Sequence, residues 1–120
     1  MKDVQLGAVE SRFADIIWEG EPLASSVLAK RAEELLGWKK TTSYTVLKRL
    51  CDKGIFQNDK GMVTSLISKK DYYAGQSTRF VEESFGGSLP AFLAAFTSKK
   101  KLSDSEIAEL QRMIDDYKED

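Results

Sequence analysis

The chain has 120 residues, of which 42% are hydrophobic, and this size supports one core of ordinary domain size with a small extension. It contains 18 basic and 19 acidic residues, one cysteine and no histidine, which excludes an internal disulfide and the usual zinc or copper sites. It has no long apolar stretch and no secretory pattern in residues 1–10, so we expect a cytoplasmic protein without cofactor, metal or membrane segment.

The charge is unevenly distributed along the chain. Residues 1–70 carry 12 basic and 9 acidic side chains, whereas residues 71–120 carry 6 and 10. Five cations gather over fifteen residues of the first part against one acid, Asp52, and could neutralise phosphates. They are Lys39, Lys40, Lys48, Arg49 and Lys53. A solvated surface of mixed charge is the alternative interpretation.

Hydrophobic residues at three- and four-residue spacing predict three short helices in the first part. The first covers residues 6–18 and ends near Gly20, and the second runs from an N-cap at Ser25 to Gly37. The third has Thr41 or Thr42 as its cap and ends at Gly54. Their expected apolar sides are Leu6, Val9, Phe13, Ile16 and Ile17 in the first, Val27, Leu28, Ala32, Leu35 and Leu36 in the second, and Val46, Leu47, Leu50 and Cys51 in the third.

Two short β-prone runs follow, Ile55-Phe56 and residues 62–67, and the polar turn between them at 57–61 predicts a β-hairpin. Three short helices followed by a hairpin is the order of a winged helix-turn-helix domain, which we assign to residues 1–70. In such a domain the third helix enters the major groove, and the hairpin turn lies beside the DNA backbone. The chain is therefore expected to be mainly α with a small β-hairpin.

Residues 71–120 predict three more helices. One runs from Asp71 to a break at Gly86-Gly87, one covers residues 89–96, and the last begins at a capping box of Ser103 and Glu106, after a loop that holds Lys99 to Lys101. Three short helices cannot bury all their apolar side chains among themselves, so we expect this region to form a homodimer. The alternative is that the helices fold back onto the N-terminal domain. The expected dimerisation residues are Leu89, Phe92, Leu93, Phe96, Ile107, Leu110, Ile114 and Tyr117.

Several segments resemble the penicillinase-repressor family, the BlaI/MecI/CopY type of winged-helix transcriptional repressor. These are residues 6–18 with Leu23, then Trp38-Lys39-Lys40-Thr41-Thr42-Ser43-Tyr44-Thr45-Val46-Leu47-Lys48-Arg49-Leu50, then Lys53-Gly54, Leu93 to Phe96, Lys101-Leu102-Ser103, and Glu106-Ile107 with Leu110. Residues 62–88 match poorly. The resemblance implies a homodimer that occupies a pseudo-palindromic operator on double-stranded DNA and represses transcription.

The resemblance also implies roles for matching residues. Groove contacts fall to Thr42, Tyr44, Thr45 and Lys48, and phosphate contacts or helix capping fall to Lys39, Lys40, Thr41 and Arg49. At the hairpin turn Met62 follows Gly61 where the family usually has arginine, so the phosphate contact falls to Lys60 alone.

Most of these residues have a structural alternative. A hydroxyl at Thr41 or Thr42 would cap a helix in any protein, and Tyr44 could pack against the second helix. Arg49 could pair with an acid such as Glu10 or Glu33, whereas we expect Lys48 to have no acidic partner one turn away. Trp18 and Trp38 are interpreted as packing residues, and Cys51 as an inert buried thiol.

The family also suggests an inducing partner. In characterised members a membrane sensor triggers cleavage at an Asn-Phe pair, and the aligned pair here is Ala95-Phe96. The copper-binding motif of a relative is absent.

Without a histidine base, a nucleophile motif or a phosphate loop, the chain is not expected to be an enzyme. Two other functions remain open at this point. One is a winged-helix module that binds protein instead of DNA, and the other is a repressor with a ligand cavity among Tyr72, Tyr73, Phe80 and Phe85.

Overall fold

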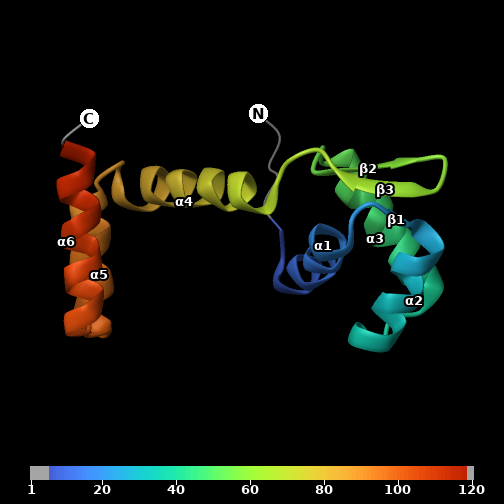
Figure 1. The fold of residues 1–120 in the computed structure, drawn as a ribbon, viewed down its shortest axis with the longest axis horizontal. Helices are drawn as coiled ribbons and strands as arrows, with labels where there is room; N and C mark the ends of the chain where they lie inside the picture. Colours follow the sequence, from blue (N-terminus) through green and yellow to red (C-terminus); the bar gives the residue numbers. More distant parts are fainter. Residues whose placement is uncertain (1–5, 119–120) are drawn as a thin grey trace. The chain divides into compact units, whose positions relative to one another are not determined.

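The computed structural model describes residues 6–118, which form six helices and one three-stranded sheet (Figure 1). The elements in chain order are α1 (Ala8–Gly20), β1 (Leu23–Ala24), α2 (Ser25–Leu36), α3 (Lys40–Asp52), β2 (Phe56–Asp59), β3 (Met62–Ser65), α4 (Lys69–Phe85), α5 (Leu89–Lys99) and α6 (Asp104–Lys118). The chain divides after Gln76, within α4, into a first and a second compact unit. The expected mainly α fold with a winged helix-turn-helix order is confirmed.

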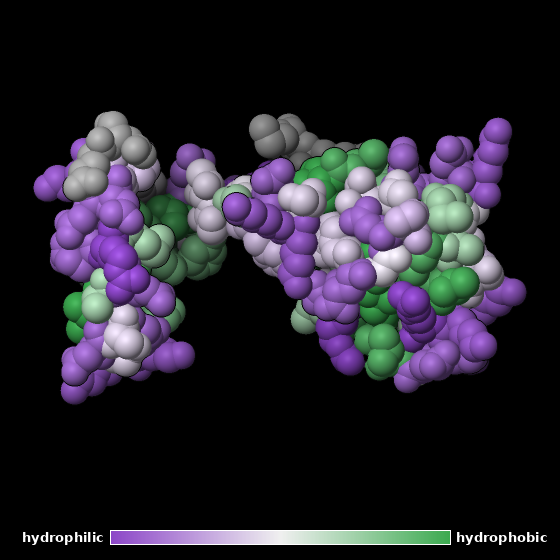
Figure 2. All heavy atoms as spheres, viewed as in Figure 1, coloured by the Kyte–Doolittle hydropathy of each residue, from purple (hydrophilic) through white to green (hydrophobic). Residues whose placement is uncertain are grey.

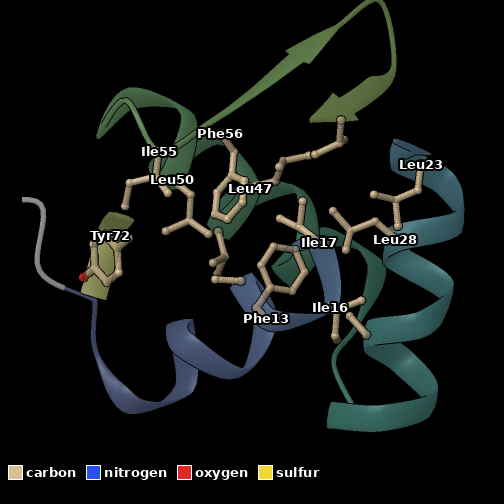
Figure 3. Close-up of a cluster of buried hydrophobic side chains, with 14 residues drawn as sticks. Phe13, Ile16, Ile17, Leu23, Leu28, Leu47, Leu50, Ile55, Phe56 and Tyr72 are labelled. Carbon is tan, nitrogen blue, oxygen red and sulfur yellow. The ribbon is translucent and has the colours of Figure 1, made fainter. Parts of the chain in front are cut away.

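The first unit is built around one closed core, drawn in Figure 3. Phe13 and Ile17 from α1, Leu50 from α3 and Phe56 from β2 are all fully buried. Trp38 stacks on Phe13 with ring centroids 4.9 Å apart. Every helix and strand of this unit contributes to the core, so burial of these side chains fixes where α3 and the hairpin lie.

Trp18 and Tyr72 connect the start of α4 to this core. The Trp18 ring centroid lies 5.1 Å from that of Phe56 and 5.8 Å from that of Tyr72. Its Nε1–H donates to the Ile67 carbonyl at 3.0 Å. The Tyr72 hydroxyl accepts a hydrogen bond from the Leu6 backbone N–H at 2.9 Å. Trp18 and Trp38 are thus packing residues, as the sequence indicated.

The expected caps of α2 and α3 are wrong by one to three residues. Ala24, with an extended backbone, is the N-cap of α2, and Ser25 is the first helical residue, with its N–H bonded to the Gly61 carbonyl at 2.7 Å. Lys39 is the N-cap of α3, without a side-chain cap, so neither Thr41 nor Thr42 has the capping role.

Several apolar side chains in α1 and α2 also depart from expectation. Val9 is 56% exposed, Val27 42% and Leu35 63%, whereas Ala14 and Ala29 are buried. The buried side of each helix thus includes fewer of the large apolar residues than their spacing suggests. The small side chain of alanine lets neighbouring helices approach closely on that side.

The hairpin, residues 56–65, is called the wing. Its turn is limited to Lys60 and Gly61, because Asp59 pairs with Met62 and residues 57–59 belong to β2. The sequence pattern missed β1, which pairs antiparallel with β3 through Leu23–Val63 and Ala24–Met62 and gives the strand order β1-β3-β2. A two-residue strand is too short to show alternating hydrophobicity.

The three C-terminal helices form as expected, with shifted ends. α4 begins at Lys69, not Asp71, because the Ser68 hydroxyl accepts from the Asp71 N–H at 3.1 Å. α5 continues to Lys99, so the expected lysine loop is wrong at that residue. The Ser103 and Glu106 capping box is confirmed, with side-chain bonds of 2.9 and 3.1 Å to the opposite backbone N–H groups.

Candidate nucleic-acid interface

The outer side of α3 is polar because its inner side takes all the large apolar residues of the helix. Val46, Leu47 and Leu50 are at most 7% exposed, and Ser43, on the same side of the helix, is 2% exposed. Thr42 and Thr45, which the family resemblance assigns to groove contacts, are exposed on the other side. Thr45 Oγ1 donates to the Thr41 carbonyl at 2.9 Å, so this hydroxyl is held against its own helix.

Lys48 has an acidic partner, contrary to expectation. Its Nζ lies 3.5 Å from Asp52 Oδ2, one helical turn further along α3, and the two side chains are 79% and 64% exposed. A surface pair of this kind contributes only about 0.3–0.5 kcal/mol, so it can exchange with an incoming ligand. Lys48 is thus accessible.

Arg49 points to the first of the two acids that the sequence suggested. Its Nη1 is 3.3 Å from Glu10 Oε2, and Lys53 Nζ is 3.5 Å from the other oxygen of the same carboxylate. Glu10 Oε1 also accepts from the Gly7 N–H at 3.1 Å, which starts α1. The Glu10 side chain is 16% exposed, so this cluster joins α1 and α3 as a half-buried ionic contact.

The pKa of Glu10 follows from that cluster. Burial acts to raise the pKa, but the Gly7 N–H, Arg49 and Lys53 all favour the carboxylate, and together they bring the pKa below its usual value of 4.5. Glu10 is therefore ionised at neutral pH and keeps its hold on Arg49.

Tyr44 lies on the side of α3 that faces the wing. With Leu47, Lys48, Cys51 and Asn58 it lines a cavity of about 310 Å³. Its aromatic ring is half-buried, and its neighbours in the cavity come from α3 and β2, not from α2. The alternative, in which Tyr44 packs against the second helix, stays a prediction.

Cys51 lies at the same cavity and is half-buried. Burial raises the pKa of its thiol, and the neighbouring Asp52 carboxylate raises it further. The protonated form of the thiol is favoured, which agrees with an inert packing role.

The wing turn presents one further cation. Lys60 is exposed and has a positive φ of 52°, and Gly61 follows with a φ of 88°. Two positive φ angles are typical of a type I′ hairpin turn. At the start of α3, Lys39, Lys40, Thr41 and Thr42 are all exposed, so the sequence-predicted cations lie at both ends of α3 and at the wing tip.

The second unit has a different surface. None of residues 77–118 is buried, and hydrophobic side chains of α5 and α6 reach the surface among charged ones (Figure 2). Leu89 is 57% exposed, Phe96 42%, Ile107 51%, Ile114 53% and Tyr117 82%, while Phe92, Leu93 and Leu110 are half-buried. Phe92, Leu93 and Leu110 line a cavity of about 240 Å³ together with Phe96, Leu102 and two glutamates.

The four aromatic residues proposed to enclose a ligand have other partners. Tyr72 and Tyr73 contact each other and Trp18 in the first unit, where Tyr72 is 4% exposed and part of the core. In the second unit, Phe80 and Phe85 each lie within 6.1 Å of Phe92 and 5.9 Å of one another, measured between ring centroids.

Among the described residues, no group of three or more cysteine or acidic side chains gathers as a metal site. No helix in the described part of the chain is both long and apolar enough to cross a membrane.

Comparison with known proteins places these features in a family. The model of a family described as penicillinase repressor matches residues 6–116. The penicillinase repressor of Bacillus licheniformis is 27% identical over 118 residues, which is 95% of this chain and 92% of the relative. The methicillin resistance regulatory protein MecI of Staphylococcus aureus (strain Mu50 / ATCC 700699) is 24% identical over 117 residues, or 94% of this chain and 95% of the relative.

Among solved structures, the solution structure of the DNA binding domain of the repressor BlaI is similar to the chain. It aligns with a TM-score of 0.53 and 26% identity, and the alignment covers 60% of this chain and 94% of that one.

Proposed function

Since this chain belongs to the penicillinase repressor family, we propose that it is a homodimeric DNA-binding repressor that occupies a pseudo-palindromic operator. The single observation that carries the proposal is the exposed, polar outer side of α3, in a unit whose fold is similar to a solved DNA binding domain. Base contacts are assigned to Thr42, Tyr44, Thr45 and Lys48.

Phosphate contacts are assigned to the cations around this helix. Lys39, Lys40 and Thr41 lie at the positive end of the α3 dipole, where backbone N–H groups and side chains favour an anion together. Lys60 at the wing tip is assigned to the adjacent backbone. Arg49 is the weakest of the assigned contacts, because Glu10 competes with phosphate for its guanidinium group.

The homodimer is proposed from the open surface of the second unit. Isolated monomers rarely leave so many large side chains exposed on neighbouring helices, and a second copy would cover the same residues on both chains by two-fold symmetry. Two-fold symmetry also suits DNA, because half-sites about 34–36 Å apart lie on successive turns of one side of the duplex. The dimerisation residues are Leu89, Phe92, Leu93, Phe96, Ile107, Leu110, Ile114 and Tyr117.

Binding to a duplex from the region upstream of the gene tests the proposal. Fluorescence anisotropy at two salt concentrations, with random duplex as competitor, should give selective binding that falls steeply with salt. Light scattering on the same sample should give the mass of a dimer. Absence of binding at low salt would favour the alternative, a winged-helix module that binds protein.

A further inference from the structure

The wing is attached to the rest of the first unit at both ends of β3, which is the central strand of the sheet. At the turn, the Gly61 carbonyl accepts a hydrogen bond from the Ser25 N–H at 2.7 Å, in addition to the pairing of Met62 with Ala24. At the other end, the Ser65 N–H donates to Glu21 Oε1 at 2.8 Å, and the Ser65 hydroxyl lies 2.9 and 2.8 Å from the two oxygens of that carboxylate. A hairpin with such contacts cannot swing freely.

These contacts connect the wing to the helices that present α3. Glu21 is the C-cap of α1, and Ser25 is the first residue of α2, which leads through Gly37 to α3. The Leu23–Val63 pair adds two side chains that are 5% and 0% exposed. The wing tip therefore keeps a fixed position relative to α2 and α3 within the first unit.

The residue at the wing tip is unfavourable for the fold itself. A type I′ turn favours asparagine, aspartate or glycine at both central positions, yet the first is Lys60 with a φ of 52°. Asn58 Oδ1 stabilises the turn by accepting from the Gly61 N–H at 2.9 Å. Strain of this kind, kept at an exposed turn with a long cation, indicates that the cation serves a ligand.

We propose that Ser25 is a positioning residue, whose backbone N–H holds the strained wing turn so that Lys60 meets a phosphate of the DNA backbone. This inference rests on the proposed function, because it needs a duplex bound to α3. It extends the interface to a residue that would not touch DNA.

Ser25→Pro is a sharp test because it removes the hydrogen bond to Gly61 and places the proline Cδ where that carbonyl oxygen lies, so the wing turn must move away. The first position of a helix accepts proline, and Ala24 has a ψ of 144°, which suits a residue before proline. The matched control is Ser25→Ala, which keeps the N–H. Operator affinity of the dimer is measured against salt for both variants, for Lys60→Ala, and for the double variant Ser25→Pro/Lys60→Ala.

We expect Ser25→Pro and Lys60→Ala to weaken binding alike, roughly tenfold at low salt, and each to lower the salt slope by about 2 per dimer, one unit for each wing. The double variant should bind no more weakly than Lys60→Ala alone, because both changes remove the same contact. Ser25→Ala should bind as the parent protein does.

Wild-type affinity in Ser25→Pro, or losses that multiply in the double variant, would overturn the positioning role. An unchanged salt slope in Lys60→Ala would overturn the wing contact itself. If the parent protein binds no duplex, the proposed function fails first, and this inference fails with it.

Lys60→Asn gives a second measurement that does not depend on Ser25. Asparagine tolerates a positive φ, so the variant should melt a few degrees higher than the parent while it binds the operator more weakly. A lysine kept for structural reasons would show the reverse, with a lower melting temperature and unchanged binding.

Discussion

The two units of this chain differ in how far they bury their apolar side chains. The first closes a core of fourteen buried residues drawn from helices and strands. In the second, none of residues 77–118 is buried, and the large apolar groups of three neighbouring helices remain accessible. The first unit therefore buries its large apolar side chains within itself, whereas the second leaves many of them exposed, which is the observation behind the proposed dimer.

The largest effect should follow from a cavity in the closed core. Phe13→Ala removes a fully buried ring stacked on Trp38 and should lower the free energy of unfolding of the first unit by about 3–5 kcal/mol. The control is Phe96→Ala, because Phe96 is 42% exposed in α5 of the second unit, and its loss should leave the stability of the first unit within about 0.5 kcal/mol. Hydrogen exchange of α1 amides measures the stability of the first unit in both variants. Equal losses would show that the core of the first unit does not stand by itself.

Disruption of the exposed apolar surface of the second unit should instead change the molecular mass in solution and the affinity for the operator. Leu110→Asp with Ile114→Asp should give monomers whose operator affinity is at least about 100-fold lower, since two linked half-sites become one. Circular dichroism should still report a folded first unit. The control, Arg112→Asp, makes the same charge change on the opposite side of α6. An unchanged mass for the double variant in light scattering would refute the dimer.

A substitution on the outer side of α3 should change the affinity for the operator and leave the molecular mass of the dimer unchanged. Lys48→Ala should weaken operator binding by about 1–3 kcal/mol if the lysine reads a base. The same loss on random duplex would mean that it contacts a phosphate. Asp52→Asn is the companion variant, because it removes the acid 3.5 Å from Lys48 and should strengthen binding at low salt.

The smallest effect concerns the ionic contact between α1 and α3. Glu10→Gln should lower stability by about 1 kcal/mol at pH 7. Because the folded-state pKa of Glu10 is lowered, its contribution is present above the usual value of 4.5 and is lost as the pH falls through the folded value. Urea titrations from pH 7 to pH 3 should therefore show the two proteins converging in acid. A constant difference would contradict the role of the charge.

The order of helices and hairpin was predictable because most boundaries have local causes. Gly37, Gly54 and the Gly86-Gly87 pair end elements where a positive φ is needed, and the capping box starts α6. The family to which the chain belongs consists of repressors, and this confirms the expectation that the chain is not an enzyme.

What the sequence could not show depends on partners far away in the chain. The N–H of Ser25 donates to Gly61, 36 positions later, and Ser25 lies in the first helical position of α2, not in the capping position that its side chain suggests. Glu21 and Ser65 carry no motif, and their contact emerges only when β1 brings α1 beside β3. By contrast, the Lys48–Asp52 pair has a signal in the sequence, the i, i+4 spacing of a lysine and an acid, which our expectation overlooked.

Both tryptophans of the chain, Trp18 and Trp38, belong to the first unit. Trp38 stacks on Phe13, and Trp18 contacts Phe56 while its indole nitrogen is bonded to the Ile67 carbonyl. Indole emission depends on such surroundings, and tyrosine is the strongest fluorophore that the second unit possesses. The protein thus carries an intrinsic optical label, with which opening of the first unit can be followed inside an intact assembly without any attached dye.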